Sequence, residues 1–184
     1  MNYMLKTIFF SLFSILLLGF TPLLSQTKES GPIITGYGEV WRIKNPDFKT
    51  NPAKEYKVVF DVMNTSESPD KLNRSIETAA RFLNMHVQSG VPYSNLKVAL
   101  VVHNKASKDL LKNSEYRSRY NTDNPNEELL QKLLDAGAEV IFCGQSSISR
   151  NIPISDTIDG VELALSAMTA LIQLQDDGFQ LIKF

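Results

Sequence analysis

Apolar residues along the chain follow two patterns in alternation, one typical of strands and the other of helices. Short continuous apolar runs are typical of strands that are buried on both faces of a parallel sheet. Three such runs stand out, at residues 56–63, 96–102 and 140–142. Weaker patterns at residues 161–165 and 179–184 predict two more strands, so five are expected.

Between the strands, apolar residues recur every three or four positions, as they do on one face of an amphipathic helix. The clearest series is Leu72, Ile76, Ala79, Leu83 and Val87. Ser68 is the expected N-cap of this helix, and Gly90 is its expected C-terminal stop. Shorter helices are predicted at residues 106–111, from Asn124 to Gly137, at 145–150 and at 166–175, whereas the polar residues 113–123 predict an exposed excursion.

Strands that alternate with helices indicate a three-layer α/β domain with a mainly parallel five-stranded sheet. This domain is expected to span residues 55–184. Residues 26–54 are rich in glycine, proline, lysine and asparagine and have no helical period, which predicts an extended N-terminal arm. The arm is expected to turn near Gly36, and Trp41 is expected to anchor it to the domain surface or to a neighbouring subunit. A solvated linker is the alternative.

The first 25 residues are predicted to be a secretory signal peptide. Lys6 precedes a nearly uninterrupted apolar run from Ile8 to Phe20, and Pro22 and Ser25 supply a helix breaker and a small residue for cleavage. The run is shorter than the roughly 20 residues that a membrane span needs. We therefore expect a periplasmic protein, and a membrane anchor formed by an uncleaved N-terminus is the alternative.

Composition excludes several classes of function. The net charge is −1 and no basic cluster stands out, so nucleic acid is not an expected partner. With two histidines and one cysteine, the chain has neither a multi-histidine metal site nor an internal disulfide. It also lacks a glycine-rich phosphate loop, so a nucleotide pocket is the least favoured function and no cofactor is expected.

The single cysteine, Cys143, stands where the third predicted strand ends. Gly144 permits a tight turn after it, and Gln145 can begin a helix whose first amides point back at the sulfur. The positive end of a helix favours a thiolate over a thiol. His103 ends the second strand at the same edge of the sheet, where it could deprotonate the sulfur if the two strands are neighbours.

Each of these residues also has a structural interpretation. A lone cysteine commonly behaves as a small buried hydrophobic residue, and a histidine at a strand end can simply bind a loop carbonyl. Asp61 lies within the first strand, and its carboxylate is expected to be satisfied by backbone or arginine groups. His86, within the first long helix, is expected at the surface or at an interface.

Several segments together resemble the DsrE/DsrF-like family, in the right order and over about residues 54–184. They are residues 56–62, 83–92, 98–103, the Cys-Gly-Gln-Ser motif at 143–146, and 170–179. The resemblance implies a Rossmann-like domain that assembles into homotrimers or homohexamers. It also implies that Cys143 carries sulfur as a persulfide, as in the sulfur-relay members. His103 matches the family's Val-Val-His, but Asn104 stands where glycine is common.

The leading hypothesis is a sulfur carrier or sulfurtransferase. In it, Cys143 accepts sulfur from a persulfide or polysulfide donor and passes it to an acceptor thiol on a small molecule or protein. The predicted catalytic residues are Cys143 and His103, and the predicted binding residues are Gly144, Gln145, Ser146, Asn104 and Asn64. The alternative is a non-catalytic oligomeric module for binding or assembly.

Overall fold

The computed structural model describes residues 27–183. The predicted signal peptide at residues 1–25 lies outside this range and stays a prediction. Among the residues described, no helix has both the length and the apolar character that a membrane crossing requires.

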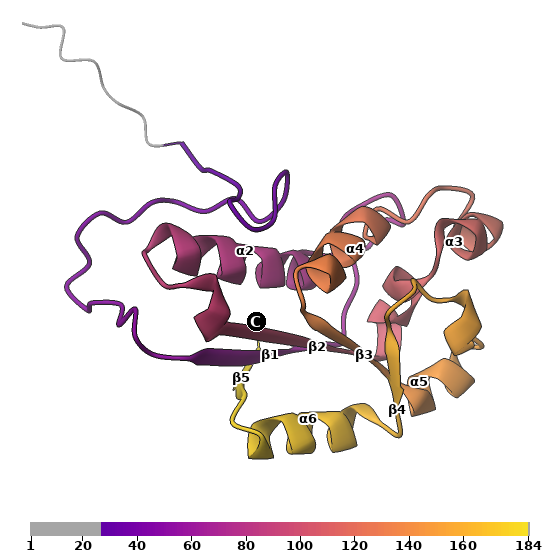
Figure 1. Cartoon of the computed structure of the whole chain (residues 1–184). Coiled ribbons are helices and arrows are strands. Elements are labelled where there is room, and N and C mark those ends of the chain that lie inside the picture. Colours follow the sequence, from indigo (N-terminus) through magenta and orange to yellow (C-terminus); the bar gives the residue numbers. More distant parts are fainter. Residues whose placement is uncertain (1–26, 184) are drawn as a thin grey trace, which may run out of the picture.

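Five parallel strands form a single sheet in the order β4-β3-β2-β1-β5 (Figure 1). The strands are β1 (Tyr56–Val62), β2 (Leu96–Val102), β3 (Glu139–Cys143), β4 (Glu162–Ala164) and β5 (Gln180–Ile182). Val62 pairs with Val102, and Val102 pairs with Phe142, so the three central strands end at the same edge. The predicted α/β class is confirmed, and the sheet is parallel throughout.

Helices cover both faces of the sheet, which gives the three layers that the pattern predicts. In Figure 1, α2 (Arg74–Gln88) and α4 (Glu127–Asp135) lie on one face, and α6 (Ala167–Asp176) lies on the other. The short helices are α3 (Asn113–Tyr120) and α5 (Gly144–Ser149). Three 3-10 segments complete the chain: η1 (Tyr93–Asn95), η2 (Asn104–Leu110) and η3 (Ile154–Asp156).

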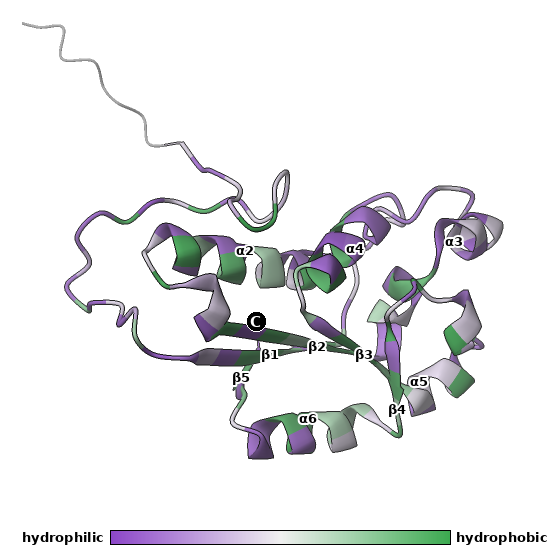
Figure 2. Cartoon of the chain, in the orientation of Figure 1, coloured by the Kyte–Doolittle hydropathy of each residue, from purple (hydrophilic) through white to green (hydrophobic). Residues whose placement is uncertain are grey.

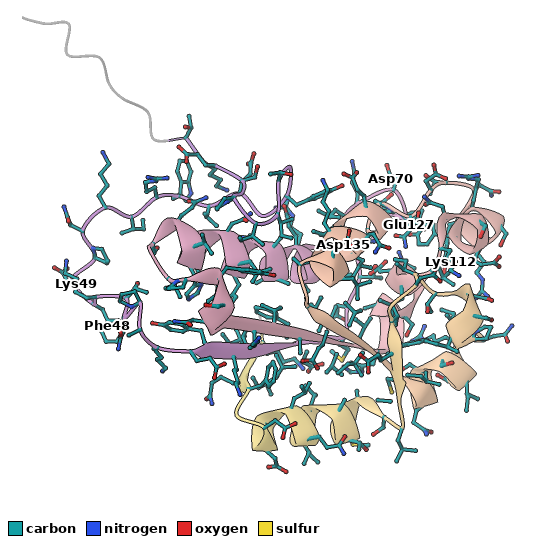
Figure 3. The ribbon with its side chains drawn as sticks, in the orientation of Figure 1. Phe48, Lys49, Asp70, Lys112, Glu127 and Asp135 are labelled. Atoms are coloured by element: carbon teal, nitrogen blue, oxygen red, sulfur yellow. The ribbon has the colours of Figure 1, made fainter. Side chains whose placement is uncertain are left out.

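The two faces of the sheet bury separate apolar clusters. Phe60 and Phe142 belong to the larger cluster, which also holds the buried residues of α2 and α4. Val59 and Cys143 belong to the smaller cluster, which includes three residues of α6. Figure 2 shows the central strands mainly in the colours of hydrophobic residues. Because successive side chains of a strand alternate between faces, the thiol lies on the α6 side.

Helix α2 begins five residues later than the pattern predicts. Its N-cap is Asn73, whose side chain accepts a hydrogen bond from the Ser75 amide at 2.9 Å, and not Ser68. The Asn73 amide group also donates to the buried carboxylate of Asp109 at 2.7 Å, a contact that fixes the start of the helix. The predicted stop is confirmed, since Gly90 takes the left-handed conformation at φ +89°.

Residues 113–123 are mostly exposed, as expected, but they contain helix α3, which the polar pattern did not predict. Tyr116 on this helix is fully buried, and its hydroxyl donates to the Pro69 carbonyl oxygen at 2.8 Å. At the next helix, α4, the N-cap is Asn126, two residues after the predicted start at Asn124. Asn124 instead accepts a hydrogen bond from the Asn126 amide at 2.9 Å within the preceding turn.

The described part of the arm, residues 27–54, runs over α2 (Figure 1). An antiparallel bridge pairs Glu29 with Val40 and closes the turn expected near Gly36. Asn84 on α2 holds this turn, because its side chain accepts from the Ile34 amide and donates to the Ile34 carbonyl, each at 2.9 Å. The buried Ile34 anchors the arm to the domain, whereas Trp41 is 48% exposed, and a contact of Trp41 with a neighbouring subunit stays a prediction.

Candidate functional site

Cys143 is both the last residue of β3 and the N-cap of α5. The turn between them is tight because Gly144 lies against the end of β4. A Cβ atom at Gly144 would stand 2.6 Å from the Ala164 carbonyl oxygen and 3.2 Å from that of Leu165. The first of these distances is shorter than real carbon contacts, so the close packing of the β3–α5 turn on β4 requires glycine here.

Polar groups at the starts of two helices favour the thiolate form of Cys143. They are the backbone amides of Gln145 and Ser146 in α5, the backbone amide of Ala167 in α6, and the Ser146 hydroxyl. As the N-cap of α5, the Cys143 side chain makes no capping hydrogen bond. Burial raises the pKa of the Cys143 thiol, since the residue is only 5% exposed, but these polar groups lower it by more, and the net pKa lies below its ordinary value.

Asn104 orients the Ser146 hydroxyl. The Asn104 amide donates to Ser146 Oγ at 3.0 Å and so holds the hydroxyl in place near the thiol whose pKa it lowers. Asn104 has φ +54°, a left-handed conformation that asparagine tolerates better than most residues other than glycine. Its side-chain oxygen also accepts a hydrogen bond from Arg150. Asn104 therefore acts on the thiol through Ser146, whose hydroxyl it holds in place.

His103 follows β2 beside Cys143, because the preceding residues, Val102 and Phe142, pair across the two strands. Its imidazole, however, is turned toward β1, with Nε2 2.6 Å from Asp61 Oδ1. Within residues 27–183 no hydrogen bond or ion pair joins His103 to Cys143. The strands are neighbours as the hypothesis requires, and the catalytic role of His103 stays a prediction.

Asp61 is held by two basic side chains, so the expectation that backbone or arginine groups satisfy it is wrong. One oxygen faces His103, and the other accepts from Lys183 Nζ at 2.8 Å. Burial raises the pKa of the Asp61 carboxyl, but the hydrogen bonds from Lys183 and His103 lower it by more, and the net pKa lies below its ordinary value. The carboxylate is therefore ionised at neutral pH and links β1 to the ends of β2 and β5.

The remaining predicted binding residues differ in their distance from the thiol. The Gln145 side chain donates to the Leu165 carbonyl oxygen at 3.3 Å and so ties α5 to the segment before α6. Asn64 follows β1, two strands away from Cys143, and its side chain is exposed. Its carbonyl oxygen accepts from Asn73 Nδ2 at 2.8 Å, and Asn64 is not among the groups that lower the Cys143 pKa.

The contribution of α6 to the site was missed by sequence reasoning. Ser166 caps this helix by accepting a hydrogen bond from the Thr169 amide at 3.1 Å, and the backbone amide of the next residue, Ala167, lowers the pKa of the Cys143 thiol. A serine N-cap directly after a predicted strand was the available signal, because it places a second helix start at this edge. In the described range no cluster of three or more His, Cys, Asp or Glu residues could hold a metal ion.

Comparisons with known proteins point to one family. The model of the DsrE/DsrF-like family matches residues 57–184. A solved structure of a protein of unknown function, MTH1491 from Methanobacterium thermoautotrophicum, is 15% identical, with a TM-score of 0.54 over 70% of this chain and 99% of that one. The ychN protein from E. coli is 19% identical, with a TM-score of 0.52 over the same shares. No curated protein matches the chain.

Proposed function

The chain belongs to the DsrE/DsrF-like family, and from this premise we propose that it carries sulfur as a persulfide on Cys143. Membership of this family indicates a role in sulfur relay in general, together with partner proteins. The observation that carries the specific proposal is the position of a sulfur with no cysteine partner in the chain at the starts of two helices, whose polar groups lower the pKa of its thiol. Structural packing alone does not require a thiol whose pKa is lowered.

The reaction exchanges one sulfur–sulfur bond for another. The Cys143 thiolate attacks the outer sulfur of a persulfide donor, the donor's bond breaks, and the donor leaves as a thiolate. An acceptor thiolate then attacks the outer sulfur of the Cys143 persulfide and releases the Cys143 thiolate. No external oxidant or reductant is needed, since each step forms one such bond and breaks one.

The polar groups that lower the Cys143 pKa assist both steps. They favour the thiolate that attacks the donor, and they stabilise Cys143 as the leaving group when the acceptor takes the sulfur. A thiol with a low pKa is a better leaving group, so sulfur is released readily. The proposal includes export to the periplasm, which rests on residues 1–25 of the sequence.

Intact mass spectrometry tests the proposal. The purified protein is incubated with inorganic polysulfide, and the mass is measured before and after treatment with dithiothreitol. We expect the wild type to gain the mass of one sulfur atom, removable by the reductant, and the Cys143→Ser variant to gain none. A wild type that gains no more sulfur than Cys143→Ser would end the proposal.

A second candidate is a non-catalytic assembly module that forms homotrimers or homohexamers. The observation in its favour is a group of large apolar side chains exposed along β4 and α6: Leu163 at 51%, Leu165 and Met168 at 73%, and Ile172 at 59%. A thiol that resists a small alkylating agent in the folded oligomer, yet reacts at once on unfolding, would favour this candidate over sulfur transfer.

A further inference from the structure

A cavity of about 760 Å³ lies between α2, β1 and β5. It is on the face of the sheet opposite to α6 and Cys143, because Phe60 and Phe82 in its wall belong to the larger apolar cluster. The cavity exists because α2 packs over β1 and β2, while the edge strand β5 has no further helix of the described chain above it (Figure 1). Its volume falls in the range of roughly 300–1,000 Å³ that small-molecule sites occupy.

Aromatic rings form much of the wall of this cavity. The ring centroids of Phe82 and His86 are 4.1 Å apart, those of Tyr56 and His86 are 5.0 Å apart, and those of Phe60 and Phe82 are 6.2 Å apart. Burial lowers the pKa of the His86 imidazole, so the ring is neutral at pH 7. His86 is only partly exposed, and the wall offers stacked uncharged rings to an apolar ligand.

Positive charge surrounds the apolar wall. Arg74 and Arg81 lie one heptad apart on α2, and both line the cavity and are exposed. Within residues 27–183 neither guanidinium has an ion-pair partner. Lys54, just before β1, and Lys57, within it, add two cations to the cavity lining. Among the lining residues the one carboxylate is that of Glu55, and its Oε2 lies 3.6 Å from Lys57 Nζ.

We propose that this cavity binds an organic anion with an apolar body, such as a medium-chain or aromatic carboxylate. The apolar body lies against the rings of Phe60 and Phe82, and the anionic group meets Arg74 or Arg81, whose guanidinium matches a carboxylate geometrically. A two-fold contact between two copies would instead bring the same positive rim against itself, which like-charge repulsion disfavours. The site is independent of sulfur transfer at Cys143.

Two fluorescent probes that differ in one charged group test the proposal. Anilinonaphthalene sulfonate is an aromatic anion, and phenylnaphthylamine is its neutral counterpart. In the double variant Arg74→Gln, Arg81→Gln, we expect the sulfonate to bind roughly three- to tenfold more weakly and the neutral probe to bind as before. The matched control Arg117→Gln, Arg119→Gln removes two charges from α3, which does not line the cavity, and should change neither affinity.

A third variant locates the probe. Thr78 lines the cavity between the two arginines, and Thr78→Trp should fill the space and weaken both probes, with the fold checked by circular dichroism. Equal sulfonate affinity in the wild type and the double arginine variant would overturn the proposal. So would probe binding that declines as the protein concentration rises, because a second copy would then cover the cavity.

Discussion

Ser146 presents both a backbone amide and a hydroxyl to the Cys143 sulfur. Removing the hydroxyl in Ser146→Ala takes away one of the four polar groups that lower the Cys143 pKa and also leaves the Asn104 amide without its acceptor. We therefore expect the Cys143 pKa to rise toward its ordinary value. The ultraviolet absorbance of the thiolate, followed against pH, measures this change.

The control for that variant is Ser149→Ala, which removes an exposed hydroxyl from the same helix. The Ser149 hydroxyl donates to the Ser146 carbonyl oxygen at 3.4 Å, and it is not among the groups that lower the Cys143 pKa. We expect its thiolate titration to match that of the wild type. Equal titrations for Ser146→Ala and Ser149→Ala would show that the Ser146 hydroxyl does not stabilise the thiolate.

A second prediction at the scale of one residue concerns the close packing of Gly144 against the end of β4. In Gly144→Ala the new methyl group would push the Ala164 carbonyl away and carry the start of α6 with it. We expect the free energy of unfolding in urea to fall by about 1–3 kcal/mol. The pKa of the Cys143 thiol should rise as the Ala167 amide moves off. An unchanged urea midpoint and thiol titration would contradict the close packing described here.

Only part of the site could be predicted from the sequence. The strand end, the tight turn and the amides of α5 are local features of the Cys-Gly-Gln-Ser segment, and they are where the pattern predicts them. The Ala167 amide and the direction of the His103 imidazole depend on contacts between distant strands. Local periodicity carries no information about such contacts, so these features required the structure.

At the scale of an element, the start of α2 shows how a distant residue decides between two good caps. Ser68 and Asn73 are both favoured N-cap types. Asp109 lies 36 residues after Asn73 and accepts a hydrogen bond from its side chain, and this contact selects the later start. The interior of the helix and its end at Gly90 follow from local preferences, which is why they were predictable.

Two alanine variants separate the caps. Asn73→Ala removes the cap and leaves one oxygen of the buried Asp109 without its donor, so we expect a loss of about 2–4 kcal/mol in the free energy of unfolding. Ser68→Ala should cost less than about 0.5 kcal/mol, since its hydroxyl bonds only to the exposed Asp70. Equal losses in urea titrations of the two variants would argue against this assignment.

At the scale of the whole molecule, the parallel sheet was predictable but its strand order was not. Buried apolar runs separated by helices indicate parallel strands, because the helix between two strands carries the chain back to the edge where the first strand began, and the second strand then runs in the same direction as the first. The placement of β5 beside β1 brings Lys183 to Asp61 across 122 residues of sequence. The strand order is determined by how the helices and strands pack together in the complete domain, and no single segment of the sequence determines that packing.

The cluster of Asp61, His103 and Lys183 joins three strands, and its contribution to stability should depend on pH. The folded pKa of Asp61 is lowered, so its stabilisation is present above the unfolded value of about 3.9 and is lost as the pH falls through the folded value. We expect Asp61→Asn to cost about 1 kcal/mol at pH 7, a modest figure because Lys183 is half exposed.

Urea unfolding at pH 7 and at about pH 3 measures this effect, since the difference between wild type and Asp61→Asn should shrink as Asp61 becomes protonated. The control Asp159→Asn removes a carboxylate that is 89% exposed, although it pairs with Lys112, and should change little at either pH. A difference for Asp61→Asn that persists undiminished at the lower pH would mean that the carboxylate charge is not its source.

The central claim is that Cys143 is a thiolate stabilised by two helix starts, available for sulfur transfer. The rate of alkylation of the folded wild type by iodoacetamide, measured against pH, tests it most directly. We predict a measurable rate whose midpoint lies below the ordinary thiol pKa of about 8.5. A midpoint at or above that value, or a thiol that reacts only after unfolding, would contradict the claim.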